Sequence, residues 1–194
     1  MKELKFIHIT KCAGTYVEEM GKLHNIFWGR YHIEYGYWHK IFPRVKKELK
    51  DKYDWFMVVR NPYDRILSEY YCQWGGVGDK NKKKKVYTKR QFNEFLIDRI
   101  IHRQYDSYHY VEQYKYIDPK CKIHVVKFEN LKEDLTTLFK KYNLQITLID
   151  KKINNKESRY KKLPFTVNDF SNDLIKLINS VYDKDFKIFN YPFF

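Results

Sequence analysis

The chain has 194 residues, of which 43% are hydrophobic, enough for a substantial core in a single globular domain spanning residues 1–194. Lysine and arginine number 38 against 24 acidic residues, so the formal charge is +14 and acidic partners are expected, such as nucleotides, sulfated glycans or nucleic acid. No apolar run reaches the roughly eighteen residues of a membrane span, and no secretion signal opens the sequence, so we expect a soluble, cytoplasmic protein.

The first half of the sequence alternates strand-like and helix-like segments. We predict a buried strand from Leu4 to Ile9 and a helix from about Thr15 to His24. A basic helical stretch over residues 44–50 precedes a second buried strand, Trp55 to Val59. Pro62 then marks a helix start, because the first turn of a helix does not use the N–H that proline lacks.

The second half continues this alternation. Thr88 and Gln91 form the capping-box pattern of a helix that we expect to reach Ile101. The other predicted elements are a short helix over 108–116, a strand from Ile123 to Phe128, a helix capped by Asn130 with Glu133 and ending at Lys140 and Lys141, and a last helix near Asn168–Val181. Strands that alternate with helices predict an α/β fold with a mainly parallel central sheet flanked by helices.

The three cysteines, Cys12, Cys72 and Cys121, stand far apart in the sequence. They form no CxxC pair and no Cys/His cluster, so the sequence predicts no metal site. A sparse, odd count fits a reducing compartment better than a disulfide scaffold.

The candidate ligand-binding residues lie at two strand-to-helix junctions. At the first, Lys11 precedes Gly14 and Thr15, which gives an ammonium group, a close backbone approach and a hydroxyl at a helix start. The first glycine of a Walker A loop is missing, so an ordinary ATP or GTP site is disfavoured. The alternative for this segment alone is an ordinary turn with a surface lysine.

At the second junction, Arg60 ends a buried strand and Ser68 follows eight residues later in the predicted helix. Open α/β sheets bind ligands at the carboxyl ends of their strands, so both side chains are candidates for one phosphate. Arg65 is expected to pair with Asp64 or Glu69 instead, in a structural role. Together the two junctions predict a site for a ligand with two separated phosphate-like groups.

Both segments resemble the donor-binding motifs of sulfotransferases. Residues 11–15 resemble the 5′-phosphosulfate loop of these enzymes, and residues 60–71 resemble their 3′-phosphate motif, RNPxxRxxSxY. The order and separation are similar to those in the branch that contains heparan and chondroitin sulfotransferases. One departure is Thr10, which stands where related sequences often have a proline before the lysine.

The resemblance implies a P-loop-like three-layer fold. It also implies transfer of a sulfuryl group from 3′-phosphoadenosine 5′-phosphosulfate (PAPS) to a hydroxyl of a carbohydrate acceptor, without a metal. By the same resemblance, the residues that hold the 5′-phosphosulfate are Lys11, Cys12, Ala13, Gly14, Thr15 and Tyr16, and Lys11 also takes part in catalysis. Arg60 and Ser68 hold the 3′-phosphate, while Lys156 or Ser158 closes over the adenosine end.

A hydroxyl acceptor must lose a proton, which calls for a base with a pKa near neutrality. His39 is the preferred base, because a catalytic histidine precedes the arginine by a similar distance in the glycosaminoglycan-type relatives. His32 is the alternative, and Glu34 is a fallback carboxylate base. His109 and Gln113 are candidates for the acceptor cleft.

Two other functions compete with this interpretation. A nucleotide-dependent phosphotransferase lacks support, because the Walker A pattern and an acidic magnesium site are both missing from the sequence. A non-catalytic polyanion- or nucleic-acid-binding domain would use the basic charge, but nothing resembles a ribonucleoprotein motif or a zinc finger, so nucleic acid is not expected. The acceptor stays open among a polyanionic glycan, another polysaccharide, a tyrosyl protein and a small molecule.

Overall fold

The structure is a computed structural model that describes residues 2–28, 39, 41–72, 74, 76–77, 87–103, 108–149 and 165–194. The chain forms two compact units, and each is built from two segments of the sequence. Unit 1 comprises Met1–Arg60 and Lys115–Asn154, and unit 2 comprises Asn61–Tyr114 and Asn155–Phe194. The chain passes from the first unit to the second between Arg60 and Asn61, inside the second predicted junction.

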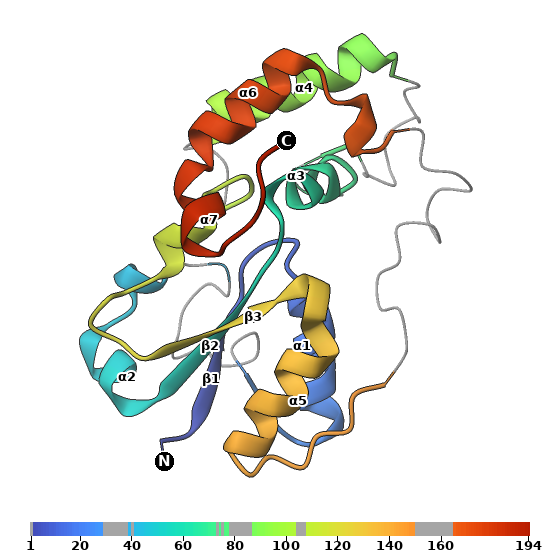
Figure 1. Cartoon of the computed structure of the whole chain (residues 1–194). Helices are drawn as coiled ribbons and strands as arrows, with labels where there is room; N and C mark the ends of the chain where they lie inside the picture. Colours follow the sequence, from blue (N-terminus) through green and yellow to red (C-terminus); the bar gives the residue numbers. More distant parts are fainter. Residues whose placement is uncertain are drawn as a thin grey trace. The chain divides into compact units, whose positions relative to one another are not determined.

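Unit 1 contains a three-stranded sheet in the order β1-β2-β3 (Figure 1). Its strands are β1 (Leu4–Ile7), β2 (Asp54–Val59) and β3 (Ile123–Lys127), and both pairings are parallel. Every residue of β1 and β2 is buried, as expected for strands covered on both faces. The predicted parallel α/β arrangement is therefore confirmed.

Aromatic packing on one face of the sheet joins α1 (Gly14–Leu23) and α5 (Leu131–Lys141) to β2. Trp28 meets the Phe56 ring edge-on at 5.2 Å between ring centres and stacks on Phe139 of α5 at 5.6 Å. Gly21 of α1 leaves room for the same indole, because a Cβ there would lie 2.1 Å from Trp28 Nε1.

The other face of the sheet is covered by the segment before β2, because neighbouring residues of a strand point to opposite faces. Trp55 packs against Phe42 at 4.8 Å between ring centres, and its Nε1 donates to the Lys50 carbonyl at 3.3 Å. Phe42 lies in the 3-10 helix η2 (Phe42–Arg44), and Lys50 lies in α2 (Lys47–Lys52). Helices thus flank the sheet on both faces, in agreement with the predicted layered fold.

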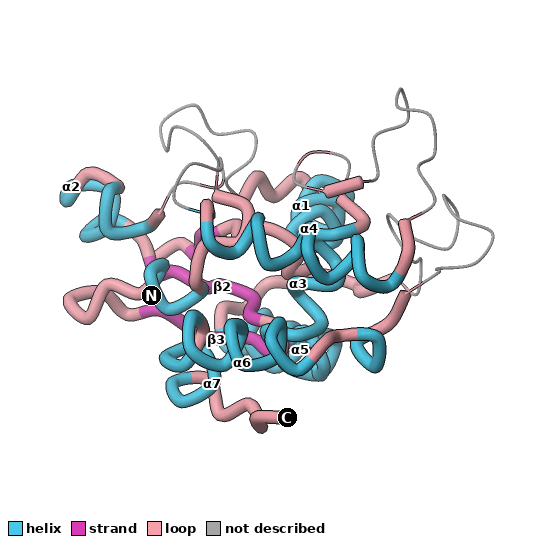
Figure 2. Tube along the Cα trace, turned by 90° about the horizontal axis from the view of Figure 1, so that it is seen from above, coloured by secondary structure: helices cyan, strands magenta, loops and turns pink. Residues whose placement is uncertain are grey.

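The described part of unit 2 is helical, as the cyan segments in Figure 2 show. Its helices are α3 (Pro62–Tyr70), α4 (Lys89–Ile101), η7 (Val167–Asp169), α6 (Asn172–Val181) and α7 (Asp183–Ile188). Helix α4 lies beside α6 (Figure 1), and Asn93 of α4 connects to the turn before α6. Its Nδ2 donates to the Asp169 carbonyl at 2.9 Å, and its Oδ1 accepts from Ser171 N at 2.7 Å.

Several sequence predictions differ from the structure. The segment 108–116 is helical only in η4 (Gln113–Tyr116), since Tyr108 and Tyr110 have positive φ angles that a right-handed helix excludes. Asn130 precedes α5 but its side chain makes no capping hydrogen bond. The last predicted helix is split, because Ser171 caps α6 at Leu174 N after the short turn η7.

In the portion of the chain that the structure covers, no helix combines the length and the apolar character needed to cross a membrane.

Candidate active site

The first candidate motif is the turn between β1 and α1. Lys11 and Ala13 have left-handed backbones, with φ of 59° and 57°. Left-handed residues in a turn curve successive N–H groups toward one point, which makes a concave anion site. No side chain caps α1 and its first turn carries no acidic residue, so the positive end of the helix dipole faces the same region. This turn therefore fits a phosphate or sulfate group.

The side chains of this turn divide into two groups. Cys12 is fully buried, whereas Lys11 and Thr15 are half-buried. The Tyr16 hydroxyl donates to the Ile149 carbonyl at 3.0 Å, and burial raises the pKa of this phenol. Tyr16 thus ties α1 to the segment after α5, and its backbone N–H is the group placed at the helix start.

His8 packs directly against the start of α1. A Cβ on Gly14 would lie 1.8 Å from His8 Nε2, so only glycine admits the imidazole at this position. The His8 Nδ1 lies 3.7 Å from a carboxylate oxygen of Glu18, and both side chains are buried. Sequence reasoning gave Gly14 the role of backbone approach to a ligand, and the structure adds close packing against His8.

Arg60 follows the last residue of β2, at the carboxyl end of the sheet. Its Nη1 lies 3.5 Å from the carbonyl oxygen of Lys11, a residue 49 positions away in sequence. Its guanidinium carbon is 4.1 Å from the centre of the Phe128 ring, which begins η5 (Phe128–Asn130). Lys11 and Arg60, one residue from each predicted motif, therefore meet within unit 1, near the ends of adjacent parallel strands, where open α/β sheets bind ligands.

His39 is held by two hydrogen bonds within unit 1. Its Nδ1 lies 3.0 Å from the carbonyl oxygen of His8, and its own carbonyl accepts from the Tyr116 hydroxyl at 3.1 Å. A carbonyl oxygen can only accept, so Nδ1 carries the hydrogen and the neutral ring has its lone pair on Nε2. The ring also meets the His8 ring edge-on, with 4.6 Å between ring centres. This tautomer is the one that a proton acceptor at Nε2 requires.

Ser68 and Arg65 belong to α3 in unit 2, and both are buried. Arg65 Nη1 donates to the Val111 carbonyl at 2.7 Å, and its Nη2 lies 3.9 Å from Glu69 Oε1. The predicted structural role of Arg65 is therefore confirmed. Helix α3 begins at Pro62, as the sequence predicts, and Asn61 caps it by accepting from Tyr63 N at 3.0 Å.

The two candidates for the acceptor cleft are buried in unit 2. His109 Nδ1 lies 2.7 Å from Glu69 Oε2. Gln113 is fully buried, its backbone N–H donates to Asp185 Oδ2 at 2.8 Å, and its amide lies 3.4 Å from the same oxygen. These contacts stabilise unit 2, and a role for either residue in acceptor binding stays a prediction.

The remaining sequence candidates, His32, Glu34, Lys156 and Ser158, lie outside the described residues. Sequence reasoning assigned no role in the site to three residues that contact it, namely His8, Phe128 and Tyr116. For His8 a signal existed, because its imidazole follows β1 directly and precedes the lysine turn by three positions. Phe128 and Tyr116 carry no local signal, since only the folded unit brings them to Arg60 and His39.

Comparison with known proteins agrees with this geometry. Residues 2–192 match the sulfotransferase family, so the match covers nearly the whole chain. No curated protein and no solved structure matches the chain significantly. The turn between β1 and α1, with Lys11 and Arg60 in contact, fits a donor that carries phosphate and sulfate groups. The chain therefore belongs to the sulfotransferase family, whose members are enzymes that take the sulfuryl group from PAPS.

Proposed function

We propose that this sulfotransferase modifies a hydroxyl of a carbohydrate and that His39 is its general base. The observation that carries the proposal is the 3.0 Å hydrogen bond between His39 Nδ1 and the His8 carbonyl. It favours the tautomer with a lone pair on Nε2, and it anchors His39 to the residue that packs on the start of α1.

In the proposed mechanism the acceptor oxygen attacks the sulfur in line with the bond to the departing phosphate. His39 Nε2 takes the hydroxyl proton as the new sulfur–oxygen bond forms and the old one breaks. Negative charge then grows on the leaving phosphate oxygen. Lys11 and the N–H groups at the start of α1 stabilise that charge, which is how fixed cations and dipoles accelerate group transfer.

Donor binding in this proposal uses both junctions. Gly14, Thr15 and Tyr16 hold the 5′-phosphosulfate through the backbone, together with the neighbouring Cys12 and Ala13. Arg60 and Ser68 hold the 3′-phosphate, and Lys156 or Ser158 contacts the adenosine. The stacking of Arg60 on Phe128 supports its part, because it restricts the orientation of the planar guanidinium and of its fork of N–H donors.

The carbohydrate acceptor rests on the likeness of the two motifs to the heparan and chondroitin branch, with His109 and Gln113 as candidate contacts. The formal charge of +14 supports an anionic glycan, since a basic surface raises the local concentration of a polyanion. His32 and Glu34 are the alternative bases within the proposal. A tyrosyl protein or a small phenol as the preferred acceptor would overturn the carbohydrate assignment.

Calorimetric titration with 3′-phosphoadenosine 5′-phosphate (PAP), without magnesium and beside ATP, tests donor recognition. We expect PAP to bind more tightly than ATP, and the Arg60→Ala variant to lose that preference. Equal binding of the two nucleotides, or an unchanged preference in Arg60→Ala, would remove the assigned role of Arg60.

Sulfate transfer from PAPS to a panel of desulfated glycans then tests the base. His39→Ala should lower the turnover number by roughly 10²–10⁴-fold while PAP affinity stays unchanged. The matched control is His102→Ala, because His102 Nδ1 also lies 3.0 Å from a backbone carbonyl, that of Asp98, but in unit 2. Full turnover in His39→Ala would exclude His39 as the base.

A further inference from the structure

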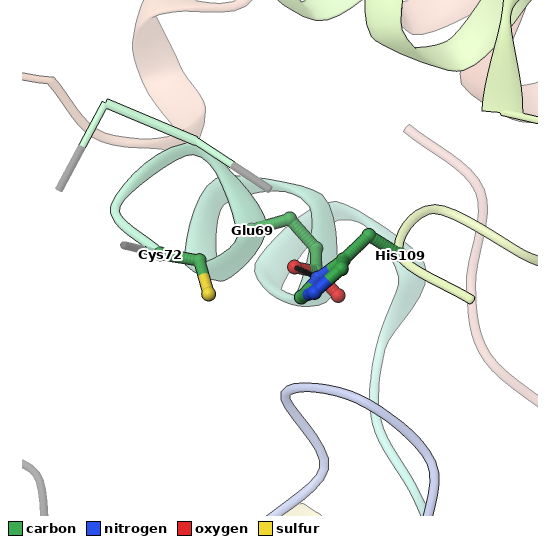
Figure 3. Close-up of side chains that lie close together, drawn as sticks. All are labelled: Glu69, Cys72 and His109. Atoms are coloured by element: carbon green, nitrogen blue, oxygen red, sulfur yellow. Dashed lines mark hydrogen bonds and ion pairs between the residues drawn. The ribbon is translucent and has the colours of Figure 1, made fainter. Parts of the chain in front are cut away.

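Unit 2 contains a cluster of potential metal ligands that lies outside the proposed donor site. Glu69, Cys72 and His109 each offer one ligand atom, and these atoms all lie within 4.8 Å of one another (Figure 3). All three residues are buried, with relative exposures of 0%, 6% and 9%. We propose that they form a binding site for one borderline divalent metal ion, for which Zn²⁺ is the best match.

The donor set points to zinc rather than to a harder cation. Thiolate sulfur, imidazole nitrogen and carboxylate oxygen are the three ligand types that Zn²⁺ takes in proteins, whereas Mg²⁺ and Ca²⁺ take oxygen ligands. Three protein ligands leave one position of a tetrahedron for water. Metal binding displaces the Cys72 thiol proton, since the thiolate is the ligand.

The distances require only small side-chain movements. In a tetrahedral zinc site neighbouring ligand atoms lie about 3.3–3.6 Å apart, from bond lengths of about 2.0–2.3 Å. His109 Nδ1 and Glu69 Oε2 are 2.7 Å apart in a hydrogen bond, so on binding the imidazole hydrogen would move from Nδ1 to Nε2 and the two atoms would separate slightly. Cys72 Sγ, within 4.8 Å of both, would move inward. Rotations about side-chain bonds provide shifts of this size.

The backbone holds the ligands from two elements. Glu69 lies in the last turn of α3, and Cys72 N donates to the Glu69 carbonyl at 2.9 Å just beyond it. Ligands three residues apart on a helical turn lie on the same side of it. His109 comes from a turn whose next residue, Tyr110, is fixed because its carbonyl accepts from the Tyr182 hydroxyl at 2.6 Å.

A neighbouring arginine orients the carboxylate. Arg65 Nη2 lies 3.9 Å from Glu69 Oε1, which leaves Oε2 facing His109. Arg65 is itself fixed by its 2.7 Å hydrogen bond to the Val111 carbonyl. Outer contacts of this kind set the direction of metal-ligating carboxylates. The alternative for the same residues is a buried hydrogen-bonded network without an ion. Such a network would give no thiolate-to-cobalt charge-transfer band and no rise of the thermal unfolding midpoint with zinc.

The proposed role is structural, and as a metal ligand His109 could not also contact the acceptor, so this site would replace its candidate role in the acceptor cleft. The ion would tie the end of α3 to the turn at His109, two segments of unit 2 that are 40 residues apart in sequence. Lys11, Arg60 and His39, the residues of the proposed reaction in unit 1, are not involved.

Cobalt substitution of the full chain, purified with reduced cysteines, tests the site. We expect Co²⁺ alone to give the intense near-ultraviolet thiolate-to-cobalt charge-transfer band and the visible bands of tetrahedral cobalt, and Zn²⁺ to abolish them. Cys72→Ser should lose the charge-transfer band, and Glu69→Gln should weaken cobalt binding. The matched control is Cys121→Ser, since Cys121 lies in unit 1 outside the cluster and should leave the spectrum unchanged.

The proposal is overturned if Co²⁺ gives no charge-transfer band, or if the band persists in Cys72→Ser and disappears in Cys121→Ser. If Cys72→Ser does not fold, zinc-edge X-ray absorption of the Cys121→Ser protein decides whether the bound ion has a sulfur ligand. A single sulfur beside nitrogen and oxygen ligands supports the site, and a shell without sulfur excludes it. Zinc should also raise the thermal unfolding midpoint of that protein, because an ion that binds only the folded state stabilises it.

Discussion

Arg60 stacks on Phe128, with 4.1 Å between the guanidinium carbon and the ring centre, and its Nη1 reaches the Lys11 carbonyl. Phe128 comes directly after β3, and Arg60 comes directly after β2, so the contact follows from the parallel pairing of these strands. The aromatic ring therefore fixes the plane of the guanidinium before any ligand arrives.

Phe128→Leu should weaken PAP binding about fivefold, because the stacking contributes about 1 kcal/mol. In the Arg60→Ala background the same substitution should have no effect, since the group that the ring positions is gone. Calorimetric titration of wild type, both single variants and the double variant measures this coupling. A fivefold effect of Phe128→Leu without Arg60 would show that the ring acts on the nucleotide directly.

Gly14→Ala should destabilise the protein by about 1–3 kcal/mol, because the added methyl group overlaps the His8 ring. Alanine otherwise favours a helix more than glycine does, so it is the steric overlap that makes the expected change in unfolding free energy destabilising. Urea unfolding at neutral pH measures the change. The cost should fall in the His8→Ala background, where the overlap is absent. An equal cost in both backgrounds would mean that another contact excludes the methyl group.

Tyr116→Phe should lower the turnover number about fivefold and leave PAP affinity unchanged. The variant removes the hydrogen bond to the His39 carbonyl, and a lost hydrogen bond of this kind corresponds to about 1 kcal/mol. Tyr114→Phe, in the same 3-10 helix, is the matched control. If positioning of His39 is the cause, the pH dependence of turnover also shifts in Tyr116→Phe, and a pH profile identical to that of the wild type would contradict it.

A buried network at the start of β2 gives a pH-dependent prediction. Burial opposes ionisation of Asp54, but a 2.6 Å hydrogen bond from the Tyr142 hydroxyl and the charges of Lys122, Lys2 and His124 outweigh it and lower the Asp54 pKa. A carboxyl whose pKa is lower in the folded state adds stability above its unfolded value of about 3.9. That stability is lost as the pH falls through the folded pKa.

Tyr142→Phe should therefore cost about 1.5–3 kcal/mol of unfolding free energy at pH 7, as expected for a hydrogen bond to a charged group. The cost should shrink at about pH 3, because this pH lies below the unfolded pKa of about 3.9 and approaches the lowered pKa of the folded state. Urea unfolding at both pH values measures the difference. Asp54→Asn, which removes the charge, should reduce the pH dependence of the Tyr142→Phe effect to the part that comes from His124, whose Nε2 lies 2.8 Å from the same hydroxyl. A cost that is constant with pH would refute this account.

The regular elements were predictable because their signals are local. The apolar run Trp55–Val59, the proline at residue 62 and the capping box of Thr88 with Gln91 each reappear in the structure, within a residue of the predicted position. The first strand ends at Ile7 rather than Ile9, because the chain turns toward a left-handed Lys11. Helix α7, a short element after Tyr182, was not predicted, because no side-chain cap marks its start in the sequence.

The candidate site was predictable only in part. Its two motifs have compact sequence patterns, which is why Lys11 and Arg60 were found without the fold. The cluster of Glu69, Cys72 and His109 was not found, because His109 is 40 residues from Glu69 and lies in a turn that was predicted to be helical. Contacts made by distant segments need the fold before they can be seen.

The two left-handed residues of the Lys11–Ala13 turn have a further consequence for ligand recognition. Each L-residue in this conformation costs roughly 1–2 kcal/mol relative to a right-handed one, and the fold maintains both. The turn is thus preorganised, so an incoming anion does not have to order the backbone N–H groups that receive it. Affinity lost through substitutions here should appear as faster dissociation, with little change in the rate of association.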